Sequence, residues 1–201
     1  LLIDADIALY LAKKLGRNRF EFFTRALEAE VVSAKRLADE VLTGIEESQF
    51  TAHYQQQFDA STREIVGLEA LIRWNHPTEG MIAPARFIGV AEDISALPVL
   101  DHHVLETALA DRRRWVAAGL RVPRIAVNVS MGRLRNERLI ETIEAMRIEP
   151  GAMAFELTEA IYLDDSDEVV SGNIRSLKEL GIDIEIDDFG TGYASIVSRM
   201  R

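Results

Sequence analysis

The side chains best suited to chemistry in this 201-residue chain are two adjacent carboxylates, Asp187 and Asp188, which end a strand-like stretch. The run Gly190-Thr191-Gly192 follows them closely. Adjacent aspartates are usually loop or cap residues, but at a strand end one could bridge two metal ions while the other holds the second. Two ions about 3.5 to 4 Å apart activate a water and stabilise both oxygens of an in-line phosphoryl displacement. The run therefore suggests a two-metal site.

A third carboxylate, Glu69, lies inside the apolar stretch 66–74. Strand periodicity places it on one face with Leu71 and Arg73, while three apolar residues take the other face. If the apolar face packs under helices, Glu69 and Arg73 point into a barrel, where a buried carboxylate needs a metal or a cation. The competing interpretation is a simple ion pair between Glu69 and Arg73 on an exposed edge strand.

Two further strand ends carry oxygen ligands. Glu156 shares a face with Ala154 and Thr158, which directs its carboxylate inward near the end of a strand. Glu159 breaks this alternation and is expected to position its neighbours from the following loop, although an acid at a helix N-terminus is the alternative. Asn128 ends another strand-like stretch, and its amide oxygen can complete an all-oxygen shell. A lone asparagine there is more often a turn or cap residue.

Other titratable residues constrain the type of site. His102 and His103 are adjacent, so a helix directs them about 100° apart and they cannot easily chelate one ion. Asp183, Glu185 and Asp187 alternate along one strand face and cannot all be buried without partners. A site of carboxylates and an amide favours hard cations, so we expect two ions of Mg²⁺ or Mn²⁺ rather than Zn²⁺.

Helix and strand periodicities alternate along the elements that must hold these side chains. Apolar residues recurring at three and four positions predict a helix over 24–47, which we interpret as a connecting helix. The expected strands cover 19–23, 50–58, 64–74, 124–129, 153–157 and 182–187, and the other expected helices cover 5–14, 84–92, 98–118, 133–146 and 165–180.

Apart from an opening hairpin-like pair, this order is that of an α/β protein with parallel strands and outer helices. Functional residues at C-terminal strand ends, without a GxGxxG turn after any strand, favour a TIM-like (β/α) barrel over an open sheet. The barrel would have an antiparallel first strand. Only about 150 residues follow residue 50, against about 250 in a complete barrel, so we expect the barrel to be incomplete at the C-terminus.

Composition limits the partners. The chain has 33 acidic and 23 basic residues and a formal net charge of -10, which argues against a nucleic-acid polymer and against an anionic membrane surface. The chain contains no cysteine and so gives no support for an oxidising compartment. No apolar stretch approaches the ~18 residues of a membrane span. We therefore expect a soluble, cytoplasmic protein without membrane contact in this segment.

Seven motifs in order resemble the EAL domain family of cyclic di-GMP phosphodiesterases, over about residues 50 to 193. Each motif alone is weak, but their order makes the resemblance specific. The motifs are Tyr54-Gln55, Glu69-Ala70-Leu71-Ile72-Arg73-Trp74, His76-Pro77 with Gly80 and Pro84, Phe87-Ile88, Val127-Asn128-Val129-Ser130, Glu156-Leu157-Thr158-Glu159, and Asp187-Asp188-Phe189-Gly190-Thr191-Gly192-Tyr193.

The resemblance implies a metal centre at the strand ends. Glu69, Asn128, Glu156 and Asp187 would bind one ion, and Asp187 would bridge to a second ion that Asp188 also binds. The implied reaction is hydrolysis of one phosphodiester bond of cyclic di-GMP to linear pGpG by a metal-activated water.

The resemblance also implies roles around that centre. Glu159 would act with the catalytic carboxylates by holding the loop 188–195, which in the family couples metal binding to dimerisation, so a homodimer is implied. Gln55, Leu71 and Arg73 would contact the dinucleotide, with Arg73 at a phosphate.

The N-terminal residues resemble a different family. Residues 4–23, with Ala5-Asp6-Ile7-Ala8-Leu9-Tyr10 and Gly16-Arg17-Asn18-Arg19, look like the tail of a GGDEF domain. The implied division is a GGDEF tail over 1–23, a connecting helix over 24–48 and a partial EAL domain over 49–201. A region before this sequence could anchor such a tandem protein in a membrane.

Two departures from the family leave alternatives open. Glu185 stands where a small residue is expected, and its charge could tighten ion binding or distort the site. The lysine that orients the water in the family, and further acidic and glutamine ligands, belong to later strands outside this chain. The alternative to an active phosphodiesterase is thus an inactive EAL module that binds cyclic di-GMP or a protein partner. A third reading is a different metal-dependent barrel hydrolase.

Overall fold

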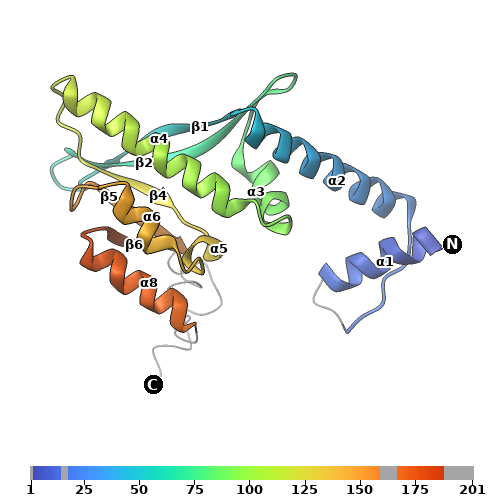
Figure 1. The fold of residues 1–201 in the computed structure, drawn as a ribbon. Coiled ribbons are helices and arrows are strands. Elements are labelled where there is room, and N and C mark those ends of the chain that lie inside the picture. The colour runs from blue at the N-terminus through green and yellow to red at the C-terminus, as the bar shows by residue number, and fades with distance from the viewer. Residues whose placement is uncertain (1, 15–17, 159–166, 188–201) are drawn as a thin grey trace.

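A computed structural model describes residues 2–14, 18–158 and 167–187 (Figure 1). The described residues form a six-stranded mixed sheet whose order is β1-β2-β4-β5-β6, with β3 paired to β2. The strands are β1 (Phe50–Phe58), β2 (Ile65–His76), β3 (Gly80–Ile82), β4 (Arg124–Asn128), β5 (Met153–Thr158) and β6 (Asp183–Asp187).

Strand directions confirm the expected architecture. β1 and β3 run antiparallel to β2, whereas β2, β4, β5 and β6 are parallel neighbours. Within the described residues the sheet does not close, because β1 and β6 remain its two edges. The fold is therefore α/β with an incomplete TIM-like barrel and an antiparallel first strand, as the sequence predicts.

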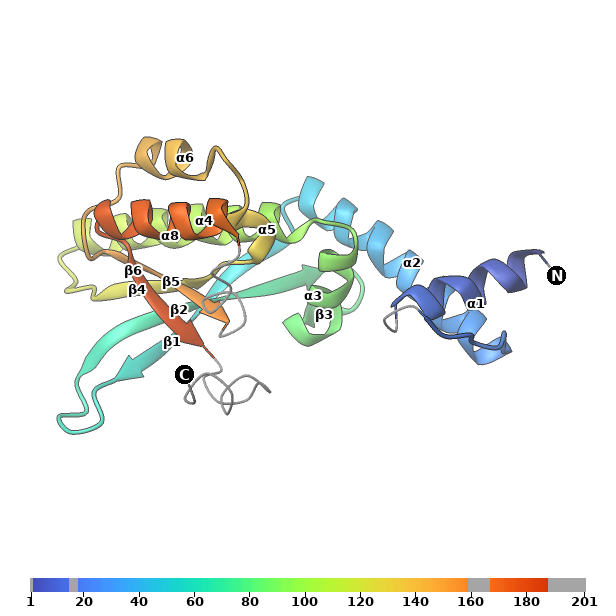
Figure 2. The ribbon, with the colours of Figure 1, turned by 90° about the horizontal axis from the view of Figure 1, so that it is seen from below.

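Helices cover one face of this sheet. Figure 2 shows α4 (Leu97–Ala117), α6 (Leu139–Ala145) and α8 (Glu168–Glu179) on the same side of the strands. The other helices are α1 (Leu2–Lys14), α2 (Arg25–Glu46), α3 (Pro84–Asp93) and the short α5 (Met131–Leu134). No helix in the described parts of the chain is long and apolar enough to cross a membrane.

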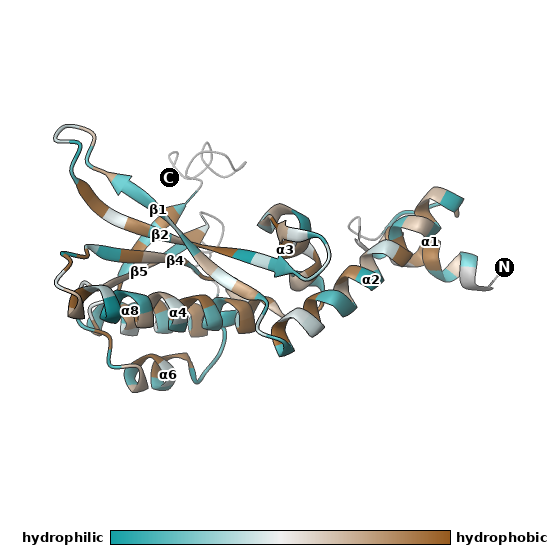
Figure 3. Ribbon diagram, turned by 90° about the horizontal axis from the view of Figure 1, so that it is seen from above, coloured by the Kyte–Doolittle hydropathy of each residue, from teal (hydrophilic) through white to brown (hydrophobic). Residues whose placement is uncertain are grey.

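The main core fills the space between the sheet and its helices. Figure 3 shows hydrophobic stretches on β2 and on α4, and Phe155 and Leu157 of β5 are fully buried in this core. Ala70 of β2 and Leu105 of α4 belong to the same cluster. This packing is the apolar sheet face that the alternation predicts, and it leaves the opposite face for polar residues.

A second core fixes α2 and α3 to the end of β2. Trp74 is fully buried, stacks on Phe50 at 5.3 Å between ring centroids, and donates from Nε1 to Gln49 Oε1 at 2.9 Å. Gly44 of α2 lies directly against this indole, since an added Cβ would lie 2.9 Å from Trp74 Nε1. Glycine is required there for the close approach of the helix.

Two predicted elements are wrong. Residues 19–23 form no strand, and Phe20 and Phe22 are 80% and 77% exposed; no described strand lies beside them to supply hydrogen-bond partners. The single helix predicted over 133–146 is divided into α5 and α6. Asn136 interrupts it, because its side chain accepts from Arg138 N at 2.9 Å in a local turn. The three-residue strand β3 was not predicted.

Candidate active site

The predicted site residues lie on the sheet face that the described helices leave uncovered. Asn128 and Glu156 are register partners on β4 and β5, and Thr158 pairs with Asp187 on β6. Glu69 of β2 is the partner of Ala126 on β4. Side chains of register partners share a face, so Glu69, Asn128, Glu156 and Asp187, here called the strand-end cluster, lie on one face of four neighbouring strands.

Direct contacts join three members of this cluster. The Asn128 side-chain amide donates to Glu69 Oε1 at 3.1 Å and to Glu156 Oε2 at 3.4 Å. The competing ion pair between Glu69 and Arg73 is not formed among the described residues, because Arg73 Nη1 instead donates to the carbonyl of Ile72 at 2.8 Å. The strand-end arrangement thus brings two carboxylates onto one amide.

Glu156 carries the electrostatic signature of the cluster. It is 7% exposed, and burial, reinforced by the charges of Glu69, Glu185 and Asp187, raises its pKa to about 7. Of the ion pairs among described residues, none involves Glu69 or Glu156. Carboxylates crowded together without a basic partner are stabilised by a cation.

The donor set fits the expected metal. Three carboxylates offer oxygen ligands, and Asn128, whose Nδ2 faces Glu69 and Glu156, would add its Oδ1; such a set suits Mg²⁺ or Mn²⁺ better than a thiophilic ion. Glu69, Asn128, Glu156 and Asp187 are the described residues that could hold it. Asp188 and Glu159, the other predicted site residues, lie outside the described residues.

The predicted substrate residues lie beside the cluster. Gln55 on β1 is exposed and is the register partner of Glu69. Leu71 and Arg73 follow Glu69 on the same face of β2, toward its C-terminal end. Together these side chains border the carboxylates on the β1 side of the open sheet face.

Gln57 belongs to the site although sequence reasoning did not name it. Its Nε2 donates to Glu156 Oε1 at 3.2 Å. It reaches across Gly67, where an added Cβ would lie 2.3 Å from Gln57 Oε1, so a side chain at position 67 would displace the Gln57 amide. Alternation from Gln55 puts Gln57 on the same strand face, and this was the signal that could have identified it.

The acids of β6 do have partners, as their alternation required. Arg124 at the start of β4 contacts Glu185 Oε1 at 2.5 Å and Asp183 Oδ2 at 3.5 Å. The unexpected Glu185 is therefore paired within the sheet face rather than left as an isolated charge beside Glu156.

The adjacent histidines behave as expected from their helical spacing. His103 Nε2 contacts the carbonyl of Phe50 at 2.9 Å, whereas His102 lies 3.4 Å from Glu106 on the next turn. They point to different partners and do not form a shared ligand pair.

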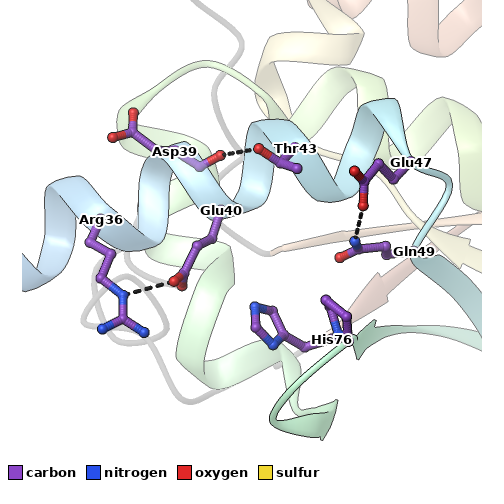
Figure 4. Close-up of a pocket in the computed structure, with 8 residues that line it drawn as sticks. Arg36, Asp39, Glu40, Thr43, Glu47, Gln49 and His76 are labelled. Carbon is purple, nitrogen blue, oxygen red and sulfur yellow. Dashed lines mark hydrogen bonds and ion pairs between the residues drawn. The ribbon is translucent and has the colours of Figure 1, made fainter.

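A second group of possible metal ligands, two glutamates and a histidine, lies at the C-terminal end of β2. This group was not predicted from the sequence. Glu40, His76 and Glu79, the helix–hairpin cluster, offer ligand atoms within 4.8 Å of one another. Figure 4 shows Glu40 and His76 bordering a cavity of about 370 Å³ beside α2. Each carboxylate already contacts an arginine: Glu40 contacts Arg36 at 2.7 Å, and Glu79 contacts Arg86.

The chain is similar to known proteins in sequence and in fold. The EAL domain family matches residues 38–199. The cyclic di-GMP phosphodiesterase NbdA of Pseudomonas aeruginosa is 35% identical over 205 residues, covering 100% of this chain and 26% of its own length. A Caulobacter vibrioides protein known only as a signaling protein is 38% identical over 98% of this chain and 24% of its own length.

Solved structures show the same fold. The PaMucR phosphodiesterase in complex with c-di-GMP has a TM-score of 0.72 at 32% identity, covering 80% of this chain and 66% of that one. The EAL enzyme Bd1971, in its form bound to cAMP and cyclic di-GMP, has a TM-score of 0.75 at 21% identity, covering 97% of this chain and 53% of that one. The chain spans about a quarter of the curated relatives' length, and it belongs to the EAL domain family.

Proposed function

We propose that this chain is part of a phosphodiesterase that hydrolyses cyclic di-GMP to linear pGpG in bacterial second-messenger signalling. The observation that carries the proposal is the strand-end cluster, in which Asn128 contacts Glu69 at 3.1 Å and Glu156 at 3.4 Å. Neither of these two glutamates forms an ion pair among the described residues. NbdA, similar over the whole chain, is a cyclic di-GMP phosphodiesterase, and PaMucR has been solved with c-di-GMP.

Each residue of the strand-end cluster has a proposed role in binding the metal ions. When bound, two Mg²⁺ or Mn²⁺ ions would supply an activated water and stabilise the oxygens of the phosphoryl displacement. Glu69, Asn128, Glu156 and Asp187 would hold the first ion, and Asp187 would also serve the second. The amide of Asn128 keeps the carboxylates of Glu69 and Glu156 in place from between them.

The roles of the two remaining acids are also proposed. Asp188 would complete the second ion's ligands, and Glu159 would hold the loop that follows Asp188. Both residues lie outside the described part of the chain, so their support is the order of the motifs around them.

Substrate recognition belongs to the β1 and β2 side. Arg73 offers a guanidinium on the same strand face as Glu69, a group that binds phosphate through paired N–H donors. Gln55 and Leu71 border the carboxylates and would contact a guanine or the sugar. With a net charge of -10, the chain needs such local positive charge and metal to bind an anionic dinucleotide.

The organisation of the longer protein is part of the same proposal. Residues 1–23 are the tail of a GGDEF domain, 24–48 the connecting helix and 49–201 the EAL part. The match of relatives such as NbdA extends over the whole chain, beyond the EAL match that begins at residue 38. We further propose a cytoplasmic homodimer, joined through its EAL parts, in which an N-terminal region could anchor the protein to a membrane.

The test is release of pGpG from cyclic di-GMP by the complete protein, with Mg²⁺ or Mn²⁺ and with EDTA as control. Metal-dependent release supports a phosphodiesterase. Tight binding of cyclic di-GMP without release would favour the inactive receptor instead. The 201-residue chain alone should not turn over the substrate, because β6 remains an edge of the sheet among the residues that the structure describes; clear turnover would contradict the need for further strands.

A further inference from the structure

An ion pair crosses the sheet face below the strand-end cluster. Arg124 begins β4, four residues before Asn128, and its guanidinium reaches Glu185 Oε1 at 2.5 Å and Asp183 Oδ2 at 3.5 Å. Both acids belong to β6, and β5 lies between β4 and β6 in the sheet. Arg124 therefore spans an entire strand to reach its partners.

Small side chains make this path possible. Ala126 of β4 and Ala154 of β5 are register partners, and Ala154 is also the partner of Asp183. Both alanines are fully buried. A longer side chain at either position would stand where the arginine crosses, so the sequence leaves room for this contact.

Glu185 is placed where its charge matters to the metal site. It is the register partner of Glu156 on the neighbouring strand, and the two side chains emerge on the same face. Asp187 lies two residues further along that face. A carboxylate at this position, if released, could turn toward the same cations as Glu156 and Asp187, because opposite charges a few ångströms apart attract strongly in a partly buried site.

We propose that Arg124 is a positioning residue that holds the Glu185 carboxylate away from the strand-end cluster, so that the cations are bound by the intended ligands alone. This inference rests on the proposed metal-dependent function. No hydrogen bond or ion pair among the described residues joins Arg124 to Glu69, Asn128 or Glu156, so it acts through Glu185. The pairing also accounts for an acid that otherwise adds uncompensated charge beside Glu156.

The test compares Arg124→Met, Glu185→Gln and the double variant Arg124→Met/Glu185→Gln in the complete protein. Mn²⁺ affinity is measured by calorimetry and pGpG release by chromatography. In Arg124→Met, the released carboxylate should tighten Mn²⁺ binding about threefold and lower kcat about tenfold through misplaced ligands. The double variant should return both values to those of Glu185→Gln, because it has no carboxylate to release.

Three results would overturn the proposal: an unchanged Mn²⁺ affinity in Arg124→Met, a weakened one, or the same defect in the double variant as in the single one. Arg112→Met is the matched control, since it removes an arginine of α4 that forms an ion pair with Glu149 at 3.1 Å. It should leave both readings unchanged. The side chain of Arg124 is 36% exposed and borders an open surface pocket. Shortening it therefore leaves no buried cavity, and the variant should fold.

The two levels of inference fail separately. If the wild-type protein binds Mn²⁺ but releases no pGpG, the proposed function fails, while the Mn²⁺ affinities still decide the role of Arg124. If the wild type is active and the affinities do not change, Arg124 has no positioning role and the function stands.

Discussion

The strand-end cluster and the helix–hairpin cluster use similar residues with opposite charge balance. At the strand ends, Glu69 and Glu156 share the amide of Asn128, and neither has an ion pair among the described residues. At the helix and hairpin, Glu40 and Glu79 each contact an arginine. Proximity of acids is common to both, so proximity alone does not define a metal site.

The surroundings of the acids decide the difference. Burial and neighbouring carboxylates raise the pKa of Glu156 to about 7, whereas the hydrogen bond from Arg86 lowers the pKa of Glu79. His76 Nδ1 also accepts from the backbone N–H of Glu79 at 3.2 Å, so that its lone pair is already used. We therefore interpret the helix–hairpin cluster as an ion-paired contact of α2, and the strand-end cluster remains our proposed metal site.

The largest expected effect separates the two clusters by activity. Glu69→Ala in the complete protein should lower pGpG release at least about a thousandfold, because losing a ligand removes several kcal/mol of transition-state stabilisation. Glu40→Ala, the matched change in the other cluster, should retain activity. Unchanged turnover in Glu69→Ala would refute the metal assignment.

Metal binding should stabilise the fold through one cluster only. Saturating Mn²⁺, compared with EDTA, should raise the Tm by about 5 to 10 °C if its concentration is about 100 times the Kd. Glu156→Gln should remove most of this rise, and Glu79→Gln should not. A rise that survives in Glu156→Gln but disappears in Glu79→Gln would exchange the two assignments.

The metal-free protein should show a pH dependence that originates at Glu156. Its pKa is raised in the folded state to about 7, so its contribution to stability is fully present below the ordinary glutamate range and is lost as pH rises through about 7. In EDTA, the urea concentration at the unfolding midpoint should therefore decrease as the pH is raised from about 5.5 to about 8. The decrease should be smaller in Glu156→Gln. Equal slopes in the two proteins would place the titration elsewhere.

The smallest effect is expected at the surface of α2. Arg36→Met removes the partner of Glu40, and exposed ion pairs contribute little, so the Tm should change by less than about 2 °C. High salt should reduce even this difference, because exposed charges are screened. A loss comparable to that of a core substitution would show that the helix–hairpin cluster holds α2 more firmly than its exposure suggests.

The convergence of the strand-end residues could be predicted from sequence because the required rules are local. Alternation along β2, β5 and β6 assigns Glu69, Glu156 and Asp187 to the face opposite the apolar residues. Parallel strands then bring their C-terminal ends to one edge. The order of motifs supplied the family, which the comparison confirmed.

The remaining contacts depend on relations that no local pattern contains. The hydrogen bond of Gln57 to Glu156 depends on the hairpin register of β1 and on the strand order. The reach of Arg124 across β5 depends on two alanines in different strands. The predicted strand over 19–23 failed for a related reason, since alternation of aromatic residues specifies a face but cannot supply a partner strand.

Gly44 has a consequence for the orientation of α1 relative to the sheet. Its contact with Trp74 fixes the rotational phase of α2 on the end of β2, the strand that carries Glu69 and Arg73. Each residue inserted into α2 before Gly44 would keep that contact and turn α1 by about 100° around the helix axis. Because Gly44 fixes one end of α2 against the sheet, the length of α2 before Gly44 determines the rotational position of α1 around the axis of that helix.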